Sequence, residues 1–465
     1  MSRSQGAERA PDSREGRSPR AHRPRVDPLR LWPAGTCYIF RPPTDGGSAK
    51  RPLDPLQAPI TSRMAKKTLE DCPPETLADE VVVVRVDYNL PLDKDGEVVD
   101  DTRLVRTLPT IQYLVEAGAK AVLLSHLGRP GGRPDPTLSL RPVAGKLEEF
   151  LGSPVGFCSA TTGPLAREAV QGMKSGEVLL LENTRFYPED TRNDPEWAEE
   201  IRFGTKLFVN DAFGTAHRAH ASTQGIADAV RRNGGEAVAG FLLEQELRFL
   251  CDTLADPEHP FVAVIGGAKI SSKIDVIEAL LPAVDRLLIG GAMANTFFKA
   301  QGWAVGDSLV EEGRIDTARL LMDLAGDKLL LPVDVLTAPY ITSDAATRVS
   351  ACDEVRKNEH IGDIGPHTTK FFADVVGGAR TVIWSGPMGV FELAPFQSGT
   401  FEVARAAAST ADRGATVIVG GGDSAAAAVA AGVVDRITHI STGGSALLEL
   451  LSGKEMPGVA ALSDR

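Results

Sequence analysis

The sequence predicts an α/β protein made of two doubly wound, parallel-sheet (Rossmann-like) domains joined by a hinge helix. Short β-branched runs alternate with helical stretches along the chain, a pattern typical of right-handed βαβ crossovers. The 465 residues allow two separate cores, since one domain usually holds roughly 100 to 200 residues. Predicted strands of the first half run into loops rich in Arg and His, whereas those of the second half run into Gly-rich loops.

The predicted hinge is the segment 241–256, whose leucines follow the spacing of one helical face while charged residues occupy other positions. These leucines are Leu243, Leu247, Leu250 and Leu254. Pro257 and Pro260 prevent the helix from continuing far. We therefore expect one domain over residues 64–240, the hinge helix over 241–256, and a second domain over 257–448.

Residues 1–63 contain 10 Pro and 11 Arg with little hydrophobic periodicity, which predicts a disordered extension. They lack the apolar core of a secretory signal. Met64 opens the segment MAKKTLEDC, which is typical of a natural start. The first 63 residues are therefore interpreted as a disordered extension or a misassigned start, in preference to a targeting segment.

Composition narrows the possible ligands. No apolar run approaches the roughly 18 to 20 residues that span a bilayer. The net charge is −12, and beyond residue 63 it becomes −18, from 38 Lys+Arg against 56 Asp+Glu, which disfavours nucleic-acid and membrane-surface binding.

Five scattered cysteines without metal spacing favour a reducing, cytoplasmic location. No heptad or apolar stripe demands a partner, so we expect a monomer.

The first half predicts strands at 80–86, 119–124, 178–181 and 207–209, with helical stretches at 110–116 and 140–150. Loops at these strand ends carry basic side chains: Arg103, His126, Arg129, Arg185 and Arg218. Guanidinium groups match carboxylate and phosphate oxygens bidentately. Together they predict a site for a small polyanion. Asp87 and Asn89 follow the first strand. They either hydrogen-bond hydroxyl groups of the polyanion or stabilise the turn after this strand.

The second half predicts strands at 261–265, 286–289, 381–384, 416–419 and 437–440. Each runs into a Gly-rich loop, and several of these loops open a helix. Backbone amides and helix N-termini of this kind cradle phosphates. No G-x-x-x-x-G-K-[ST] occurs, so this is not a P-loop protein.

Three charged residues of the second half are candidates for phosphate chemistry. Lys269 and Lys273 lie near a predicted helix start, where they are either surface lysines or cations directed at transferring phosphates. Asp423 follows three glycines and is either a helix N-cap or a ligand for Mg²⁺ bound to phosphates. An oxyacid site facing a nucleotide site across a hinge predicts phosphoryl transfer.

Ten motifs from about Met64 to the end closely resemble the phosphoglycerate kinase family. In order, they are VRVDYNLPL, DDTR, SHLGRP, LLLENTRF, VNDAFGTAHRAHAST, GGAKISSKI, IGGAMANTF, GPMGVFE, VGGGDS and HISTGG. The resemblance implies reversible phosphoryl transfer between 1,3-bisphosphoglycerate and ADP, giving 3-phosphoglycerate and ATP, with Mg²⁺. It also implies domain closure without a general base, and a C-terminal tail, 449–465, that packs on the first domain.

The resemblance assigns roles residue by residue. Substrate binding would fall to Asp87, Asn89, Arg103, His126, Arg129, Arg185 and Arg218. Nucleotide binding would fall to Lys269, Lys273, Gly291, Glu392, Gly421, Gly422, Asp423 and Ser424. Glu392 would reach the ribose and Asp423 the magnesium. The transferring phosphoryl group would be stabilised by Arg103, Lys269, Gly422 and Ser445.

Four serines depart from the family pattern. Ser385 replaces the Asn of W-N-G-P, Ser445 replaces a glycine, Ser424 replaces Thr, and Ser272 stands where an acidic residue is common. None removes a charged catalytic group, so we expect altered nucleotide affinity before lost activity.

Three other functions compete with this interpretation. A phosphoanion-binding protein without catalysis is disfavoured by the intact Arg103, Lys269 and Asp423. A Rossmann dehydrogenase would need G-x-G-x-x-G after an early strand, which the GG loops do not supply. A kinase for another small oxyacid stays open in principle.

Overall fold

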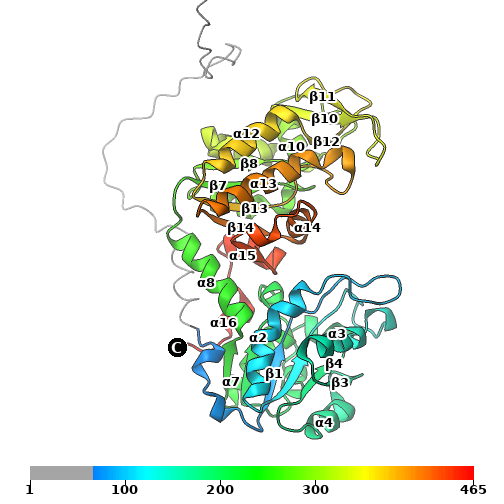
Figure 1. Ribbon diagram of the computed structural model, residues 1–465, viewed down its shortest axis with the longest axis vertical. Helices are drawn as coiled ribbons and strands as arrows, with labels where there is room; N and C mark the ends of the chain where they lie inside the picture. Colours follow the sequence, from blue (N-terminus) through cyan, green and yellow to red (C-terminus); the bar gives the residue numbers. More distant parts are fainter. Residues whose placement is uncertain (1–65) are drawn as a thin grey trace, which may run out of the picture. The chain divides into compact units, whose positions relative to one another are not determined.

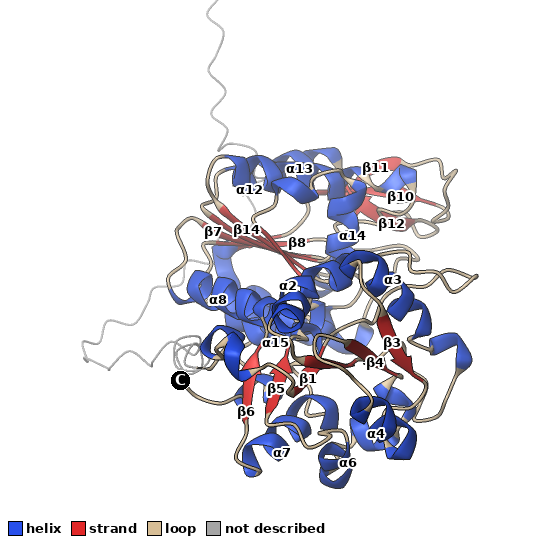
Figure 2. Cartoon of the chain, turned by 60° about the horizontal axis from the view of Figure 1, so that its bottom comes forward, coloured by secondary structure: helices blue, strands red, loops and turns tan. Residues whose placement is uncertain are grey.

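The structure is a computed structural model that describes residues 66–465. The expected extension over residues 1–63 lies outside the described residues. Two six-stranded parallel sheets, each flanked by helices, confirm the predicted α/β class (Figures 1 and 2). Among the described residues, no helix is long and apolar enough to cross a membrane.

The first sheet has the strand order β3-β4-β2-β1-β5-β6. Its strands are β1 (Val81–Arg85), β2 (Lys120–Leu124), β3 (Val155–Cys158), β4 (Val178–Leu181), β5 (Leu207–Asn210) and β6 (Glu236–Ala239). The winding reverses between β1 and β5, and the crevice beyond the carboxyl ends of such strands is where doubly wound sheets bind ligands. The two strands that were not predicted, β3 and β6, are short edge strands.

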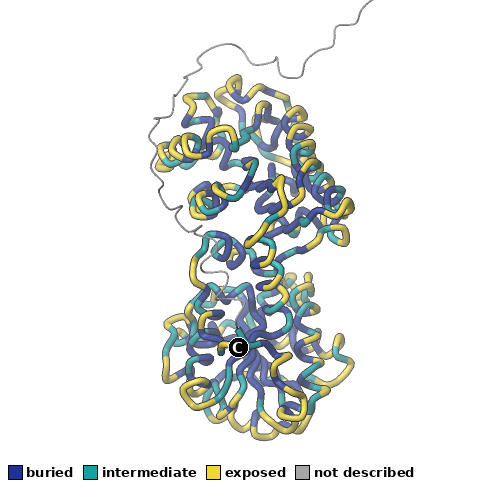
Figure 3. The backbone as a smooth tube through the Cα atoms, turned by 90° about the vertical axis from the view of Figure 1, so that its left-hand side faces the viewer, coloured by how far each residue is buried: buried dark blue, intermediate teal, exposed yellow. Residues whose placement is uncertain are grey.

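Helices cover both faces of this sheet. They are α2 (Thr102–Glu116), α3 (Arg141–Leu151), α4 (Gly163–Gln171), α5 (Pro188–Thr191), α6 (Pro195–Glu200) and α7 (Ile226–Arg232). Alternate valines of β1 face opposite sides: Val83 packs in the core with α4, α6 and α7, whereas Val82 and Val84 pack in the core with α2 and α3. Figure 3 shows the resulting buried interior. Helix α2 begins eight residues before the predicted stretch and continues through Pro109.

Helix α8 (Phe241–Ala255) connects β6 to the second sheet. Its four predicted core leucines are buried. The expectation that its charged residues avoid this face is wrong for Glu246, which is 0% exposed. The Glu246 carboxylate accepts hydrogen bonds from the Thr442 backbone N (2.7 Å) and hydroxyl (2.9 Å), and lies 2.8 Å from His439 Nε2. Burial of this charge is thus compensated by polar partners.

The second sheet has the order β15-β14-β13-β7-β8-β9. Its strands are β7 (Phe261–Ile265), β8 (Arg286–Ile289), β9 (Leu329–Leu330), β13 (Thr381–Ser385), β14 (Thr416–Gly420) and β15 (His439–Ser441). Its helices are α9 (Ile274–Leu280), α10 (Met293–Ala300), α11 (Ile315–Ala325), α12 (Pro366–Gly377), α13 (Ser398–Asp412), α14 (Gly422–Ala430) and α15 (Gly444–Leu451). Strand β15 starts two residues later than predicted, at His439, after a 3₁₀ turn at 434–436.

A three-stranded antiparallel sheet was not predicted. It has the order β11-β10-β12 and consists of β10 (Asp334–Ala338), β11 (Arg348–Ala351) and β12 (His360–Ile364). Asp334 and Asp363 interrupt the apolar pattern, yet both are buried and accept backbone hydrogen bonds. Polar residues at buried strand positions therefore concealed these strands.

The chain ends beside the first sheet. Short helix α16 (Pro457–Ala460) precedes the last residues. The Gly458 N donates to Ala216 O (2.9 Å), and the Ser463 N donates to Ala237 O (2.7 Å). These bonds attach the C-terminal tail to β6 and to Ala216, which ends the 3₁₀ turn at 213–215 that follows β5.

Candidate active site

Loops at the carboxyl end of the first sheet line a cavity of about 300 Å³, which we call the arginine-lined cavity. It brings together all seven side chains predicted to bind a polyanion: Asp87, Asn89, Arg103, His126, Arg129, Arg185 and Arg218. Its remaining wall comprises Gly128, Gly214, Thr215, His217, Gly422, Gly443, Gly444 and Ser445. Cationic side chains and backbone from the loops after β14 and β15 therefore border the same space.

Arg103 reaches the arginine-lined cavity from a helix. The expectation that it lies in a loop is wrong, because α2 already begins at Thr102, whose backbone N donates to Asp100 Oδ1 (2.9 Å). From the first turn of α2, Arg103 Nη1 lies 3.2 Å from Asp87 Oδ2. A rigid element thus holds this guanidinium at the cavity.

Asn89 holds a neighbouring loop while it lines the cavity. Its Oδ1 accepts a hydrogen bond from the Gly128 N (2.8 Å), and Arg185 Nη1 donates to Gly128 O (2.8 Å). Asp87 is buried, and its Oδ1 lies 3.4 Å from the Asn89 N. The turn role and the cavity-lining position of Asp87 and Asn89 therefore coexist.

Burial and like charges define the electrostatics of the cavity. Burial, followed by the charges of Arg218 and Arg85, lowers the pKa of Arg185 to about 10, which still leaves it cationic at neutral pH. Burial, followed by the positive charges of neighbouring arginines, holds the pKa of His126 well below its usual value. An entering anion would relieve this repulsion.

Arg85 is a residue near the cavity that the sequence interpretation missed. It is 0% exposed at the end of β1, and its Nη2 lies 3.1 Å from His126 Nδ1. One indication of this residue was present in the sequence: it is a single cation within an otherwise apolar run of valines. Such a residue almost never occurs in a fully buried strand without polar partners.

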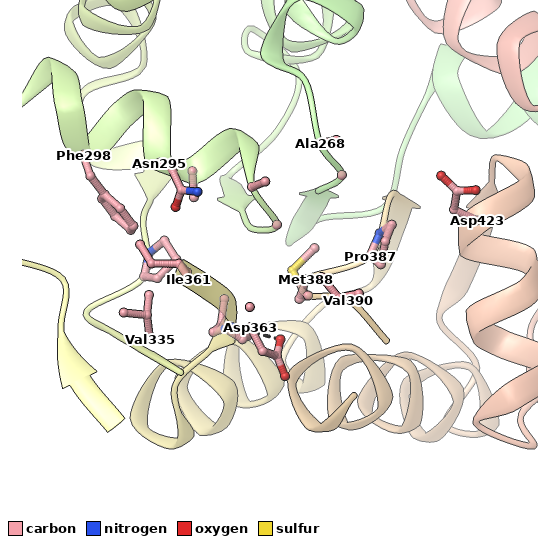
Figure 4. Close-up of a pocket in the computed structure, with 18 of the residues that line it drawn as sticks. Ala268, Asn295, Phe298, Val335, Ile361, Asp363, Pro387, Met388, Val390 and Asp423 are labelled. Carbon is pink, nitrogen blue, oxygen red and sulfur yellow. Dashed lines mark hydrogen bonds between the residues drawn. The ribbon is translucent and has the colours of Figure 1, made fainter. Parts of the chain in front are cut away.

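A second pocket, of about 280 Å³, lies beyond the second sheet. We call it the glycine-lined pocket. Its wall includes Gly267, Gly291, Asn295, Phe298, Ile361, Asp363, Met388, Glu392 and Asp423. In Figure 4, Asn295 and Phe298 extend from α10, Ile361 and Asp363 from β12, and Asp423 from α14. Predicted residues Gly291, Glu392 and Asp423 are thus brought together, whereas the apolar wall was not predicted.

The predicted residues Lys269, Lys273, Gly421 and Ser424 line neither space. Lys269 is exposed. Lys273 is partly buried and its Nζ donates to Ser385 Oγ (2.8 Å). Burial lowers the pKa of Lys273 to about 8, although the charge of Asp423 opposes this shift. A 3₁₀ turn at 270–272 separates the two lysines, and α9 begins only at Ile274.

Two residues in the first turn of α14, Asp423 and Ser424, have roles that differ from those expected from the sequence. Asp423 is the second residue of α14 and is not its N-cap, which is Gly421 with φ +103°. The hydroxyl of Ser424 is engaged internally, since it accepts from Gly386 N (2.6 Å) and donates to Gly420 O (2.9 Å). The Asp423 carboxylate is exposed and is therefore available to a ligand.

The helices of the second half, α9 to α15, begin without a hydrogen bond from the side chain of the N-cap residue. The N-cap residues of α10, α14 and α15 are Ala292, Gly421 and Gly443, and none makes a side-chain cap hydrogen bond. A Cβ added at Gly443 would lie 2.3 Å from Phe213 Cδ1, so the backbone needs a glycine there. The first amides of α10 already donate to the carbonyl oxygens of Gly267, Gly291 and Ala292. The amides at the starts of α14 and α15 are therefore the ones that can receive anionic oxygens.

Comparisons with known proteins agree in one family. The family model described as phosphoglycerate kinase matches residues 71–454. The phosphoglycerate kinase of Chlorobium chlorochromatii (strain CaD3) is 51% identical over 404 residues, covering 86% of this chain and 100% of that protein. That of Chloroflexus aggregans (strain MD-66 / DSM 9485) is 52% identical over 406 residues, with the same two coverages.

Solved structures give the same result. The phosphoglycerate kinase from Coxiella burnetii matches with a TM-score of 0.71 and 40% identity, covering 83% of this chain and 96% of that chain. The enzyme from Pyrococcus horikoshii OT3 matches with a TM-score of 0.75 and 33% identity, covering 85% of this chain and 98% of that chain.

Proposed function

The chain belongs to the phosphoglycerate kinase family, and we propose that the arginine-lined cavity and the glycine-lined pocket hold the two substrates of its reaction. The enzyme is a glycolytic kinase that transfers a phosphoryl group reversibly between 1,3-bisphosphoglycerate and ADP, giving 3-phosphoglycerate and ATP. The proposal concerns which residues bind each substrate and how they act.

The phosphoglycerate binds in the arginine-lined cavity. Its phosphate and carboxylate oxygens contact the seven residues predicted from the sequence: Asp87, Asn89, Arg103, His126, Arg129, Arg185 and Arg218. Their convergence on one cavity is the observation that carries the proposal. A carboxylate with a phosphate needs several guanidinium groups, because each charge-assisted hydrogen bond contributes only about 1.5 to 3 kcal/mol.

The nucleotide binds at the glycine-lined pocket and the adjoining helix starts. The residues involved are Lys269, Lys273, Gly291, Glu392, Gly421, Gly422, Asp423 and Ser424. The apolar wall formed by Phe298, Ile361 and Met388 suits a base. Uncapped amides at α14 suit phosphates. Phosphates placed there would lie toward Gly422, which borders the arginine-lined cavity.

Magnesium is the metal that this arrangement suits. Among the described residues, no group of three or more His, Cys, Asp or Glu side chains is arranged to hold a metal ion, so we infer that a metal here depends on ligand oxygens. Asp423 offers one exposed carboxylate at the pocket wall, and Mg²⁺ bound to phosphates needs only one or two carboxylates. When bound, Mg²⁺ neutralises charge on the nucleotide phosphates.

The chain contributes positioning and positive charge to the transfer. The attacking carboxylate or ADP oxygen is already anionic at pH 7, so no general base is needed. Arg103 and Lys269 stabilise the transferring phosphoryl group, with the backbones of Gly422 and Ser445 as further donors. Closure about α8 brings the substrates in line and excludes water that would hydrolyse the acyl phosphate.

We also propose the domain boundaries, the cellular location and the oligomeric state. Residues 64–240 form the phosphoglycerate-binding domain with the tail 449–465, helix 241–256 is the hinge, and residues 257–448 form the nucleotide-binding domain. Tail contacts at Gly458 and Ser463 support this division. We expect a cytoplasmic monomer, which sedimentation of the purified chain would test.

Calorimetric titration of each substrate separately tests the two sites. Arg129→Ala should weaken binding of 3-phosphoglycerate roughly 10- to 100-fold and leave ADP binding unchanged. Glu392→Ala should weaken only ADP binding. Arg133→Ala, which changes an exposed arginine in the same loop as Arg129, is the matched control. Loss of ADP binding in Arg129→Ala without loss of 3-phosphoglycerate binding would reverse the assignment.

A further inference from the structure

We propose that Arg85 is a positioning residue that fixes the tautomer of His126. In this tautomer, Nδ1 is an acceptor and Nε2 carries the only ring proton. His126 therefore presents a neutral N–H donor, and no fifth positive charge, to the arginine-lined cavity. That this donor receives an oxygen of 3-phosphoglycerate rests on the function proposed above.

The geometry of Arg85 leaves one possible direction for the hydrogen bond. Its Nη2 lies 3.1 Å from His126 Nδ1, and both side chains are buried. A guanidinium has five N–H donors and no acceptor. Nδ1 must therefore be the unprotonated nitrogen, which in a neutral imidazole leaves the proton on Nε2.

Arg85 is held in place on its other sides. Its Nε donates to Ser222 Oγ (3.1 Å), and Nη1 points at the carbonyl oxygens of Val86 and, at 3.5 Å, Leu124. Ser222 is itself positioned by Asp190, whose Oδ1 accepts from the Ser222 N (2.9 Å). The planar fork thus spans four partners, including His126, which the single ammonium of a lysine could not do.

A competing tautomer would need a different acceptor for Nδ1–H. The candidate is Asp87, but its Oδ1 lies 3.8 Å from Nδ1, beyond hydrogen-bonding distance. A proton on Nδ1 would also face the guanidinium of Arg85. The other charged groups around the ring are Arg103 from α2, Arg185 after β4 and Arg218 after β5, and each disfavours the imidazolium.

The opposite ring nitrogen is open to the cavity. His126 lines the arginine-lined cavity. Its Nε2 makes no hydrogen bond with the described residues. The atom is not fully enclosed by them either. The Nε2–H is therefore available to a ligand oxygen. Because this donor does not titrate near neutral pH, binding through it should not depend on pH between about 6 and 8.

Nitrogen-15 NMR of the full chain labelled at histidine tests the tautomer directly. The His126 ring should show a protonated Nε2 and an unprotonated Nδ1, unchanged from pH 6 to pH 8. Loss of the signal in His126→Gln assigns it, and His367→Gln, which changes an exposed histidine of α12, is the control. A protonated Nδ1, or an imidazolium that titrates in this range, would overturn the proposal.

Steady-state kinetics test the donor role of His126 with variants whose amide groups mimic one ring nitrogen or the other. The glutamine amide can place its NH₂ near the Nε2 position, whereas asparagine reaches only the Nδ1 position. His126→Gln should raise the KM for 3-phosphoglycerate severalfold at most, and His126→Asn about tenfold or more. The KM for Mg-ATP should change in neither. A smaller rise in His126→Asn than in His126→Gln would contradict the donor role.

The tautomer and the proposed function can fail separately. Adding 3-phosphoglycerate should shift the Nε2–H resonance of the wild-type chain. If calorimetry shows that 3-phosphoglycerate does not bind, the proposed function fails, while the spectrum of the ligand-free chain still decides the tautomer. If 3-phosphoglycerate binds and the Nε2–H signal does not move, the donor role of His126 is overturned.

Discussion

Raising the pH above 8 should weaken nucleotide binding through Lys273. Its ammonium is partly buried and donates to Ser385 Oγ. Burial lowers the pKa of Lys273 from the ordinary 10.5 to about 8, and Asp423 only partly offsets this effect. The ammonium attracts nucleotide phosphates, whereas the neutral amine does not. The nucleotide therefore binds best where Lys273 is protonated.

The size of the effect follows from the fraction of protonated Lys273. At pH 9, one unit above a pKa of about 8, about one molecule in ten carries the charge, so the KM for Mg-ATP should rise roughly tenfold over its value at pH 7. Bound phosphates stabilise the ammonium, so kcat at saturating Mg-ATP should vary less. The profile of kcat/KM reports the pKa of the free enzyme.

The assay is coupled turnover of 3-phosphoglycerate with Mg-ATP from pH 7 to 9.5. Lys273→Gln should have an elevated KM for Mg-ATP that no longer rises with pH. Lys370→Gln changes an exposed lysine of α12 and should keep the wild-type profile. A wild-type KM that stays constant to pH 9.5, or an undiminished rise in Lys273→Gln, would refute the reasoning.

The same shift predicts a stability effect of known sign. The folded pKa of Lys273 lies below its ordinary value, so the unfolded chain binds more protons between pH 8 and 10.5. The free energy of unfolding contributed by Lys273 should therefore rise with pH across this window. Urea titrations of the wild type and of Lys273→Gln, compared at several pH values, measure it. A contribution that falls with pH would contradict the burial of the ammonium.

Three further variants test the structure. Glu246→Ala should lower the free energy of unfolding by about 1 to 3 kcal/mol, because buried His439 and the Thr442 backbone N lose their hydrogen-bond partner; an unchanged urea midpoint would contradict this. Gly443→Ala places a Cβ 2.3 Å from Phe213 Cδ1 and should destabilise by about 1 to 3 kcal/mol, seen as a lower melting temperature. Asp423→Asn should raise the magnesium concentration for half-maximal turnover roughly tenfold; an unchanged magnesium titration would exclude this ligand.

The sequence predicted the sheets well because their buried strands are short, continuous apolar runs. Strands β4, β7 and β8 have the predicted bounds, since a charged residue, a proline or a glycine flanks each apolar run. The antiparallel sheet was missed because Asp334 and Asp363 occupy buried strand positions. Hydrogen bonds to backbone N–H groups stabilise them there, and such tertiary partners are invisible in a sequence.

The arginine-lined cavity was predictable because parallel strands deliver their loops to one edge of the sheet. Arg129 and Arg185 could be predicted as anion-binding residues because arginines in loops after strands indicate this role. The position of Arg103 on a helix depended on where α2 begins, at Thr102, whose backbone N donates to Asp100. The role of Arg85 and the occupied hydroxyl of Ser424 depended on three-dimensional contacts that spacing does not encode. The glycine-lined pocket was only partly predicted, because its apolar wall comes from α10 and from the antiparallel sheet.

The most direct test of the central claim is coupled turnover of 3-phosphoglycerate with Mg-ATP by the wild type, Arg103→Ala and Arg106→Ala. Arg106 lies one turn further along α2 and does not line the arginine-lined cavity. We predict that kcat falls at least 100-fold in Arg103→Ala, from about 3 kcal/mol of lost transition-state stabilisation, and stays near wild type in Arg106→Ala. Equal turnover in Arg103→Ala and the wild type would contradict the assignment of this cavity as the site of phosphoryl transfer.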